Sequence, residues 1–192
     1  MTSRFVPFTV TVCGIEELSG HGAAGVTHVL SILDPGEPEP AAFGAFGEHR
    51  RLELRFHDII EDLPAEVPPD AGHVAAILDF GRGLLAEPGG CGHLLVHCHM
   101  GISRSTAALT MLLAQARPDR PADEAVAAVA AIRDKTWPNL RMIEYADAAL
   151  GRKGDLIDAV RRRHREVGLA RPDIVTYMRE NHRSREVDWF AP

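Results

Sequence analysis

The chain has 192 residues, a length typical of a single domain with a substantial hydrophobic core. Hydrophobic residues make up 45% and charged residues 25% of it, as in ordinary globular proteins. The net charge of −6 at pH 7 gives no reason to expect a nucleic-acid partner, and no stretch approaches the ~20 apolar residues of a membrane-spanning helix. Three cysteines do not make a disulfide framework, so we expect a reducing, cytoplasmic location and no membrane partner.

The first half of the chain has the pattern of strands joined by short connections. Phe8, Val10 and Val12 alternate with threonines, which predicts a half-buried strand rather than a signal peptide. Two later runs are rich in β-branched and apolar residues and predict further strands. The elements expected here are strands over residues 6 to 12, 26 to 33 and 51 to 56, a short helix over 15 to 18, a turn at 34 to 36, and a helix over 70 to 86 with Asp70 as its N-cap.

The stretch around which the chain is organised is residues 94 to 106, which reads as an apolar strand, a short loop and the start of an apolar helix. Five residues separate Cys98 from Arg104. A loop this short points its backbone N–H groups inward and joins them to the positive end of the helix dipole. That environment favours the thiolate form of a cysteine, and the planar fork of an arginine can hold two oxygens of a phosphate. The sequence therefore predicts an anion cradle with a thiol at its base.

The other residues of this loop have supporting roles in the same interpretation. Gly101 lets the turn adopt a positive φ without a Cβ clash. Ser105 can donate a hydrogen bond to the thiolate and help it leave in a second step. Because backbone amides and Arg104 neutralise the phosphoryl oxygens, no metal or other cofactor is required. The expected phosphate-binding residues are His99, Met100, Gly101, Ile102, Ser103 and Arg104.

The run VHCHMGISRS, residues 96 to 105, resembles the HC-x5-R-[ST] signature of cysteine-dependent protein tyrosine phosphatases, and is most similar to their dual-specificity branch. The resemblance covers roughly residues 5 to 150, and a composition rich in Ala, Arg, Gly and Pro is typical of a bacterial member. It implies that Cys98 attacks phosphorus to give a phosphocysteine. An aspartic acid then protonates the leaving oxygen, and the same residue later activates a water molecule.

We expect this aspartic acid to be Asp58. It comes just after the strand over 51 to 56, and functional groups collect where the parallel strands of an α/β sheet end. The stretch FHDI, residues 56 to 59, also resembles the general-acid loop of the family, which lies some tens of residues before the cysteine. Glu61 and Asp62 are close enough in the sequence to be rivals for the role.

A zinc site is a rival use of the same thiol, because soft nitrogen and sulfur ligands cluster within nine residues: Cys91, His93, His97, Cys98 and His99. Three of these are consecutive, which sends their side chains in different directions, and no C-x2-C pair is present. We therefore predict no metal site. A reversible disulfide between Cys98 and either Cys91 or Cys13 stays open.

Beyond the loop, the pattern predicts further helices. They are expected over residues 104 to 116, 122 to 133, 155 to 167 and 172 to 183. The segment TWPNLRM, residues 136 to 142, resembles the PN-containing turn that dual-specificity phosphatases carry near the cysteine loop. Asn139 is then either support for that loop or a simple helix cap, and His97 is a second supporting residue. Trp189 and Phe190 are expected to pack back on the body or on a second subunit, and the oligomeric state stays open.

The sequence as a whole predicts an α/β fold with a central, mostly parallel sheet of four to five strands flanked by helices, like that of the phosphotyrosine phosphatases. Residues 1 to 150 are expected to form the phosphatase catalytic domain, and residues 151 to 192 a helical extension packed on it. The arginine-rich helix of this extension is expected to face solvent.

The expected function is hydrolysis of a phosphomonoester, on a phosphorylated protein or a small aryl or alkyl phosphate. A loop with no cation but Arg104 favours a shallow, permissive site, and the sequence does not distinguish phosphotyrosine from phosphoserine or phosphothreonine. The alternatives are a catalytically weak phospho-binding module on the same scaffold and a rhodanese-like sulfurtransferase.

Overall fold

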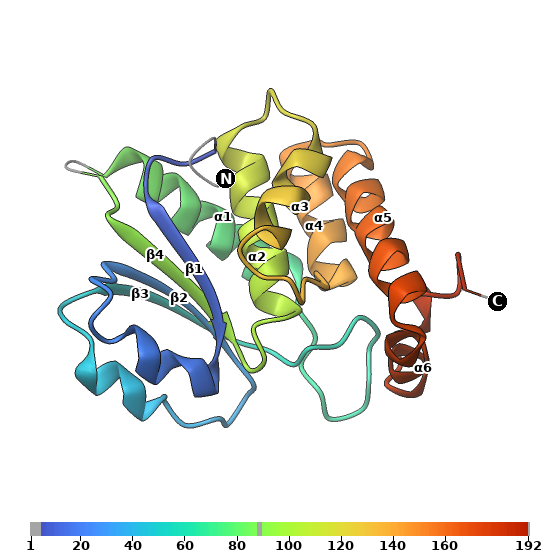
Figure 1. Cartoon of the computed structure of the whole chain (residues 1–192), viewed down its shortest axis with the longest axis horizontal. Helices are drawn as coiled ribbons and strands as arrows, with labels where there is room; N and C mark the ends of the chain where they lie inside the picture. Colours follow the sequence, from blue (N-terminus) through green and yellow to red (C-terminus); the bar gives the residue numbers. More distant parts are fainter. Residues whose placement is uncertain (1–4, 88–89, 192) are drawn as a thin grey trace.

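The computed structural model describes residues 5–87 and 90–191. Within these residues, four strands form one parallel sheet in the order β1-β4-β2-β3 (Figure 1). The predicted α/β fold is confirmed, with parallel pairing throughout and the smaller of the two expected strand numbers. The strands are β1 (Thr9–Gly14), β2 (His28–Leu33), β3 (Arg50–Arg55) and β4 (His93–Cys98). β1 begins later than predicted because its pairing with β4 starts at Thr9↔His93.

Most of the helices that the structure describes were predicted, whereas those over residues 140–150, 41–45 and 184–186 were not. The α-helices are α1 (Ala71–Ala86), α2 (Arg104–Ala116), α3 (Ala122–Ala130), α4 (Leu140–Leu150), α5 (Asp155–Ala170) and α6 (Pro172–Glu180). Shorter 3-10 helices are η2 (Ile15–His21), η3 (Ala41–Ala45) and η4 (Ser184–Glu186). α3 and α6 are each three residues shorter than predicted. At the end of α3, Ile132 already bonds three residues back to Val129, which marks a turn rather than a continuing helix.

Helical segments cover both faces of the sheet. Successive side chains of a strand point to opposite faces, so each strand contributes to two apolar clusters. The larger cluster joins one face to the α-helices and includes Val12, Leu30 and Val96. The smaller cluster joins the other face to η2 and η3, and includes Cys13, Leu18, Val29, Phe43 and Leu95. In Figure 1 the α-helices lie on one side of the sheet and the two short helices on the other.

The central unit of this architecture is β4 followed by α2. Every residue of β4 is buried, which explains why Leu94, Leu95 and Val96 read as a continuous apolar run rather than an alternating one. Residues 104 to 114 of α2 are all buried as well. The loop that joins them is therefore held at both ends by the core.

The C-terminal helices pack on this body. α5 contributes Leu156, Ala159 and Val160 to the larger cluster. A third cluster is formed around Trp137 by Val175, Met178 and Val187, and Phe190 packs against it, whereas Trp189 is 45% exposed. In the described part of the chain, no helix is long and apolar enough to cross a membrane.

Two fully buried histidines predict how stability depends on pH. Burial lowers the pKa of both His97 and His164 to about 4. Histidines of an unfolded chain titrate near about 6.5, so the unfolded state takes up protons first as the pH falls. We expect the free energy of unfolding to decrease as the pH falls from about 6.5 to 4. Below about pH 4 the full loss is roughly 3 kcal/mol per histidine. Urea unfolding over a pH series measures this.

The substitution His164→Gln should remove about half of that pH dependence, because one of the two titrations is lost. His182→Asn is the matched control, since His182 is exposed and its left-handed backbone suits asparagine. An identical pH slope in His164→Gln and the wild type would show that buried His164 does not contribute to the slope.

Candidate active site

Parallel pairing brings the carboxyl ends of the strands to one edge of the sheet (Figure 1). Gly14 of β1 is in register with Cys98 of β4, and Leu33 of β2 with Arg55 of β3. The segments that follow these ends are the loop over residues 98 to 104, which we call the cysteine loop, and the acids after β2 and β3. All of them are therefore delivered to the same edge, as expected for functional groups in a parallel α/β sheet.

The cysteine loop is built around a buried thiol. Cys98 is only 2% exposed, and its Sγ lies 3.2 Å from Ser105 Oγ. Gly101 has φ 67°, and a Cβ there would come within 2.5 Å of the backbone of Cys13. A Cβ at Gly14 would likewise lie 2.9 Å from the carbonyl of His99. Both glycines are required because β1 and the loop approach backbone to backbone.

Four successive carbonyl groups of this loop are held by donors outside it. Ile15 N donates to the His99 carbonyl at 2.9 Å, and Trp137 N to the Ile102 carbonyl at 3.0 Å. Between these, Arg133 donates from Nη2 to the Met100 carbonyl at 2.9 Å and from Nε to the Gly101 carbonyl at 3.0 Å. In a trans peptide the N–H points opposite to the C=O of the same unit. The N–H groups of residues 100 to 103 are therefore turned to the other side, as an anion cradle requires.

Arg104 is buried, and the hydrogen bonds described for its guanidinium are made by Nη1. Its Nη1 donates to Asp34 Oδ1 and to the Phe56 carbonyl, both at 2.5 Å. Its Nε is buried and has no hydrogen-bond partner among the described residues. A buried N–H left without an acceptor is costly. The guanidinium thus has one edge fixed by the protein and an Nε that an anionic ligand can satisfy.

Asp58 lies against the cysteine loop, with its Oδ1 held by three donors. Ser103 Oγ donates at 2.7 Å, Asn139 Nδ2 donates at 2.9 Å, and Arg183 Nη1 makes an ion pair at 3.2 Å. Burial raises the pKa of this carboxyl, and the opposite charges of Arg183 and Arg104 lower it. With the hydrogen bonds from the hydroxyl and the amide, they hold the pKa below its usual value. Asp58 is therefore ionised at neutral pH in the free protein.

The two predicted supporting residues lie on different sides of the sheet. Asn139 caps α4, because its Oδ1 accepts from Met142 N at 3.1 Å, and its Nδ2 bonds Asp58, so both expected contacts are present. His97 is buried on the face opposite Cys98, with its ring 5.6 Å from that of Phe43. Neither ring nitrogen of His97 has a hydrogen-bond partner in the described residues. His97 supports the loop by packing in the core.

The rival acids point elsewhere. Glu61 pairs with Arg185 at 2.8 Å, and Asp62, whose side chain is 82% exposed, pairs with Arg141 at 2.8 Å. Each carboxyl is occupied by an arginine outside the cysteine loop.

The three cysteines are free. Cys13 is in register with His97, so its side chain lies on the face opposite that of Cys98. Burial also raises the pKa of the Cys13 thiol to about 12. Cys91 precedes β4 and Cys98 ends it, so the length of the strand, roughly 16 Å, separates the two. Neither thiol is placed to form a disulfide with Cys98.

No group of three His, Cys, Asp or Glu side chains converges to hold a metal in the residues that the structure describes. Within the sequence cluster weighed for zinc, His93 is engaged on both ring nitrogens. Its Nε2 bonds Thr11 Oγ1 at 2.8 Å and its Nδ1 bonds the Ala24 carbonyl at 3.1 Å.

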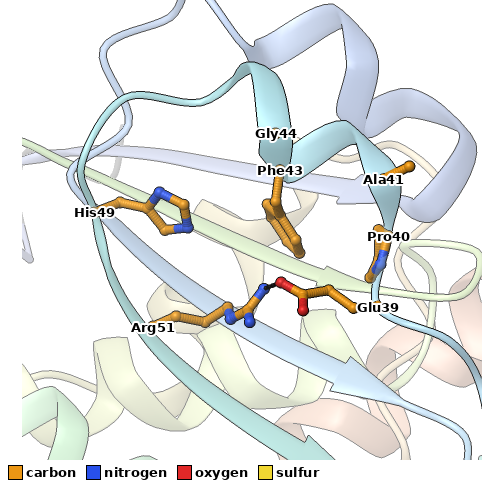
Figure 2. Close-up of a pocket in the computed structure, with 7 residues that line it drawn as sticks. All are labelled: Glu39, Pro40, Ala41, Phe43, Gly44, His49 and Arg51. Carbon is orange, nitrogen blue, oxygen red and sulfur yellow. Dashed lines mark ion pairs between the residues drawn. The ribbon is translucent and has the colours of Figure 1, made fainter.

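A shallow hollow on the η3 side of the sheet carries no candidate nucleophile. Arg51 and Glu39 reach toward one another across it and form an ion pair at 2.6 Å (Figure 2). The guanidinium of Arg51 also lies 4.9 Å from the centre of the Phe43 ring. The charges in this hollow thus satisfy each other. Its lining residues are Glu39, Pro40, Ala41, Phe43, Gly44, His49 and Arg51.

Three residues of the site were not predicted from the sequence. Asp34 directly follows β2, so the strand-end rule that selects Asp58 after β3 could have found it. Arg133 and Arg183 each lie three residues after the end of a helix, α3 and α6 respectively, and carry no motif. Only the three-dimensional structure identifies these two arginines as part of the site.

Comparisons with known proteins agree with this geometry at the level of the fold. No family model and no curated protein gives a significant sequence match. Among solved structures, human DUSP28 matches with a TM-score of 0.54 and 19% identity, covering 74% of this chain and 94% of that chain. PTPMT1 in complex with PI(5)P matches with a TM-score of 0.54 and 18% identity, covering 75% of this chain and 91% of that chain.

A third similar structure is the human tyrosine phosphatase-like serine/threonine/tyrosine-interacting protein, with a TM-score of 0.51 and 22% identity. It covers 73% of this chain and 87% of that chain. The chain therefore has the fold of the dual-specificity phosphatases and related proteins, as the resemblance of its cysteine loop predicts.

The carbonyl contacts of Arg133 can be tested by oxyanion binding. We expect Arg133→Met to weaken tungstate binding about tenfold, because two charged hydrogen bonds that orient the loop are lost. Isothermal titration at neutral pH measures the affinity. Arg162→Met is the matched control, since Arg162 makes an exposed ion pair with Asp123 and has no described contact with the cysteine loop. Equal affinities in the two variants would contradict the orienting role.

Proposed function

We propose that this chain is a cysteine-dependent phosphomonoesterase of the protein tyrosine or dual-specificity phosphatase type. The observation that carries the proposal is the buried Arg104, which begins α2 six residues after the buried Cys98 and has an Nε without a partner in the described residues. A helix N-terminus, inward N–H groups and a free guanidinium edge suit a phosphate dianion. The similar fold of several phosphatases supports the same conclusion.

In the first proposed step, the Cys98 thiolate attacks phosphorus. The S–P bond forms as the bond from phosphorus to the leaving oxygen breaks, and Asp58 transfers a proton to that oxygen. The inward N–H groups and Arg104 neutralise the three equatorial oxygens. A phosphate dianion next to Asp58 raises the pKa of its carboxyl, which opposes the lowering by Arg183 in the free protein.

In the second proposed step, Asp58, now a carboxylate, takes a proton from a water molecule as that water attacks the phosphocysteine. The S–P bond breaks and inorganic phosphate is released. The Cys98 sulfur leaves as a thiolate, and Ser105 Oγ, 3.2 Å away, can donate a hydrogen bond to it. Neither proposed step involves a redox change or a metal.

The surroundings of the cysteine loop favour a protein substrate over a multiply phosphorylated one. Met100 is 61% exposed at the rim. A hollow of about 290 Å³ beside it is lined by Glu16 and Glu17 as well as by Arg133 and Lys135. Arg133 is already paired with Glu17 at 3.0 Å, and the charge of Glu16 offsets that of Lys135, so this rim offers no net positive charge to additional phosphates. A phosphorylated side chain on an extended peptide segment therefore fits better than a polyanionic lipid headgroup.

A non-catalytic phospho-binding role is the second candidate. The observation in its favour is Asp58, which is ionised in the free protein and cannot donate a proton until a ligand raises its pKa. One similar structure is also named as a phosphatase-like interacting protein. Turnover of p-nitrophenyl phosphate separates the two candidates.

Replacing the nucleophile should abolish turnover without abolishing binding. Cys98→Ser lacks an ionised nucleophile near neutral pH, so we expect no measurable hydrolysis of p-nitrophenyl phosphate but retained tungstate binding. Cys91→Ser is the matched control, as Cys91 is also buried but separated from Cys98 by β4, and it should keep its activity. Phosphatase activity surviving in Cys98→Ser would end the proposal, and thiosulfate:cyanide transfer without phosphatase activity would favour the sulfurtransferase.

Replacing the acid should slow the reaction according to the leaving group. For Asp58→Asn we expect kcat to fall by ~10²–10⁴-fold with an alkyl phosphate, and by less with p-nitrophenyl phosphate, whose leaving oxygen needs less help from a proton. The basic limb of the pH profile should also flatten. Asp62→Asn, which alters an exposed ion pair, serves as the control. A loss that does not depend on the leaving group would assign proton transfer to another group, Asp34 first.

A further inference from the structure

The segment that follows α6 reaches back into the candidate active site. Arg183 lies just after this helix and just before η4, near the end of the chain, yet it is only 5% exposed. Burying a guanidinium costs free energy unless each of its edges is paired. The partners of Arg183 therefore indicate what this segment does.

Arg183 joins three parts of the molecule. Its Nη1 lies 3.2 Å from Asp58 Oδ1, and its Nη2 donates to Ser103 Oγ of the cysteine loop at 3.0 Å. Its Nε and Nη2 donate to Glu186 of the same segment at 2.8 and 2.9 Å. Ser103 in turn donates to Asp58 Oδ1 at 2.7 Å, so these three groups form a closed ring of contacts.

Glu186 fixes the orientation of Arg183. It is fully buried, and it accepts from Trp137 Nε1 at 2.8 Å and from Leu140 N at 3.0 Å. Leu140 is the first residue of α4, so the carboxylate also lies at a helix N-terminus, where negative charge is stabilised. The orientation of Arg183 is thus set by the C-terminal segment and by α4 before any ligand binds.

The charged groups that face Asp58 within the described residues are few. Arg183 approaches it from the C-terminal segment and Arg104 from α2. Ser103 and Asn139 contribute neutral hydrogen bonds from the cysteine loop and from the N-cap of α4. Glu186 and Tyr177 are titratable groups close to Arg183. Removing Arg183 therefore removes one of two cations from this carboxyl.

We propose that Arg183 is the positioning residue of Asp58, so that the C-terminal segment completes the active site. Every contact of Asp58 described above is made by Oδ1, and this fixes the rotation of the carboxyl group and leaves Oδ2 as the oxygen that carries the transferred proton. The inference deepens the proposed phosphatase function and rests on it. It assigns to this segment a role in proton transfer in addition to its packing on Trp137.

The direct test is the ionisation of Asp58 itself. We expect Arg183→Met to raise the pKa of the Asp58 carboxyl by about one to two units, because an opposite charge at this distance favours the ionised form. The ¹³C shift of the carboxyl carbon, followed against pH and assigned with Asp58→Asn, measures this in the full chain without any substrate. The basic limb of the kcat/KM profile should move to higher pH by a similar amount.

Arg185→Met is the matched control. Arg185 belongs to the same segment and ties it to the loop after β3 through Glu61, but it does not contact Asp58. If the segment acted only by packing, the two variants would behave alike. We expect Arg185→Met to leave the pKa of Asp58 and the pH profile unchanged, and Arg183→Lys, which keeps the charge, to restore most of the wild-type profile.

A second variant tests the inference even if Arg183→Met fails to fold. Arg183→Met leaves Glu186 buried without its cation, which is strongly destabilising. The double variant Arg183→Met with Glu186→Gln removes both charges together and should show the same rise in the pKa of Asp58.

The outcomes separate this inference from the proposed function. An unchanged Asp58 pKa in the folded double variant overturns the role of Arg183, whether or not the protein is a phosphatase. A raised pKa in a protein that hydrolyses no phosphomonoester supports the coupling of Arg183 to Asp58 and overturns the proposed function instead.

Discussion

The site depends on the outward orientation of four successive carbonyl groups, those of residues 99 to 102. Each accepts a hydrogen bond from outside the cysteine loop, and the N–H groups are thereby turned inward before any anion binds. This orientation requires that β1 lie directly against the loop, which is why Gly14 and Gly101 have no room for a Cβ. Arg133, in the segment that follows α3, completes it by donating to two of the carbonyls. Such preorganisation is what stabilises charge on a transferring phosphoryl group.

Two arginines of the site, Arg104 and Arg183, are also held in a fixed orientation before a ligand binds. Arg104 has Asp34 on one edge, and Arg183 has Glu186 on one edge, so each guanidinium is oriented by a carboxylate that does not take part in the proposed chemistry. The remaining edge of Arg104 carries the unpartnered Nε that we propose binds the anion, and that of Arg183 contacts Asp58. A buried cation held by hydrogen bonds has a defined orientation, and it influences the ionisation of the groups that it faces.

The sequence allowed prediction of whatever is encoded locally. The strands and most of the α-helices were recognised from their periodicity, and Cys98 and Arg104 from their spacing within one loop. The strand order could not be predicted, because it depends on contacts between segments far apart in the chain. Asp34 meets the same strand-end rule as the predicted acid, but its position in a turn concealed its pairing with Arg104. Arg133 and Arg183 look like ordinary surface arginines in the sequence, and only the fold brings them to the site.

The central claim is that Cys98 forms a covalent bond to phosphorus. Rapid acid quenching of the protein during turnover of p-nitrophenyl phosphate, followed by peptide mass spectrometry, measures this most directly. The proposed mechanism predicts one added phosphoryl group on the peptide that contains Cys98, and none on that peptide in Cys98→Ser. Steady turnover with no phosphopeptide, or with the phosphoryl group on any other residue, would contradict it.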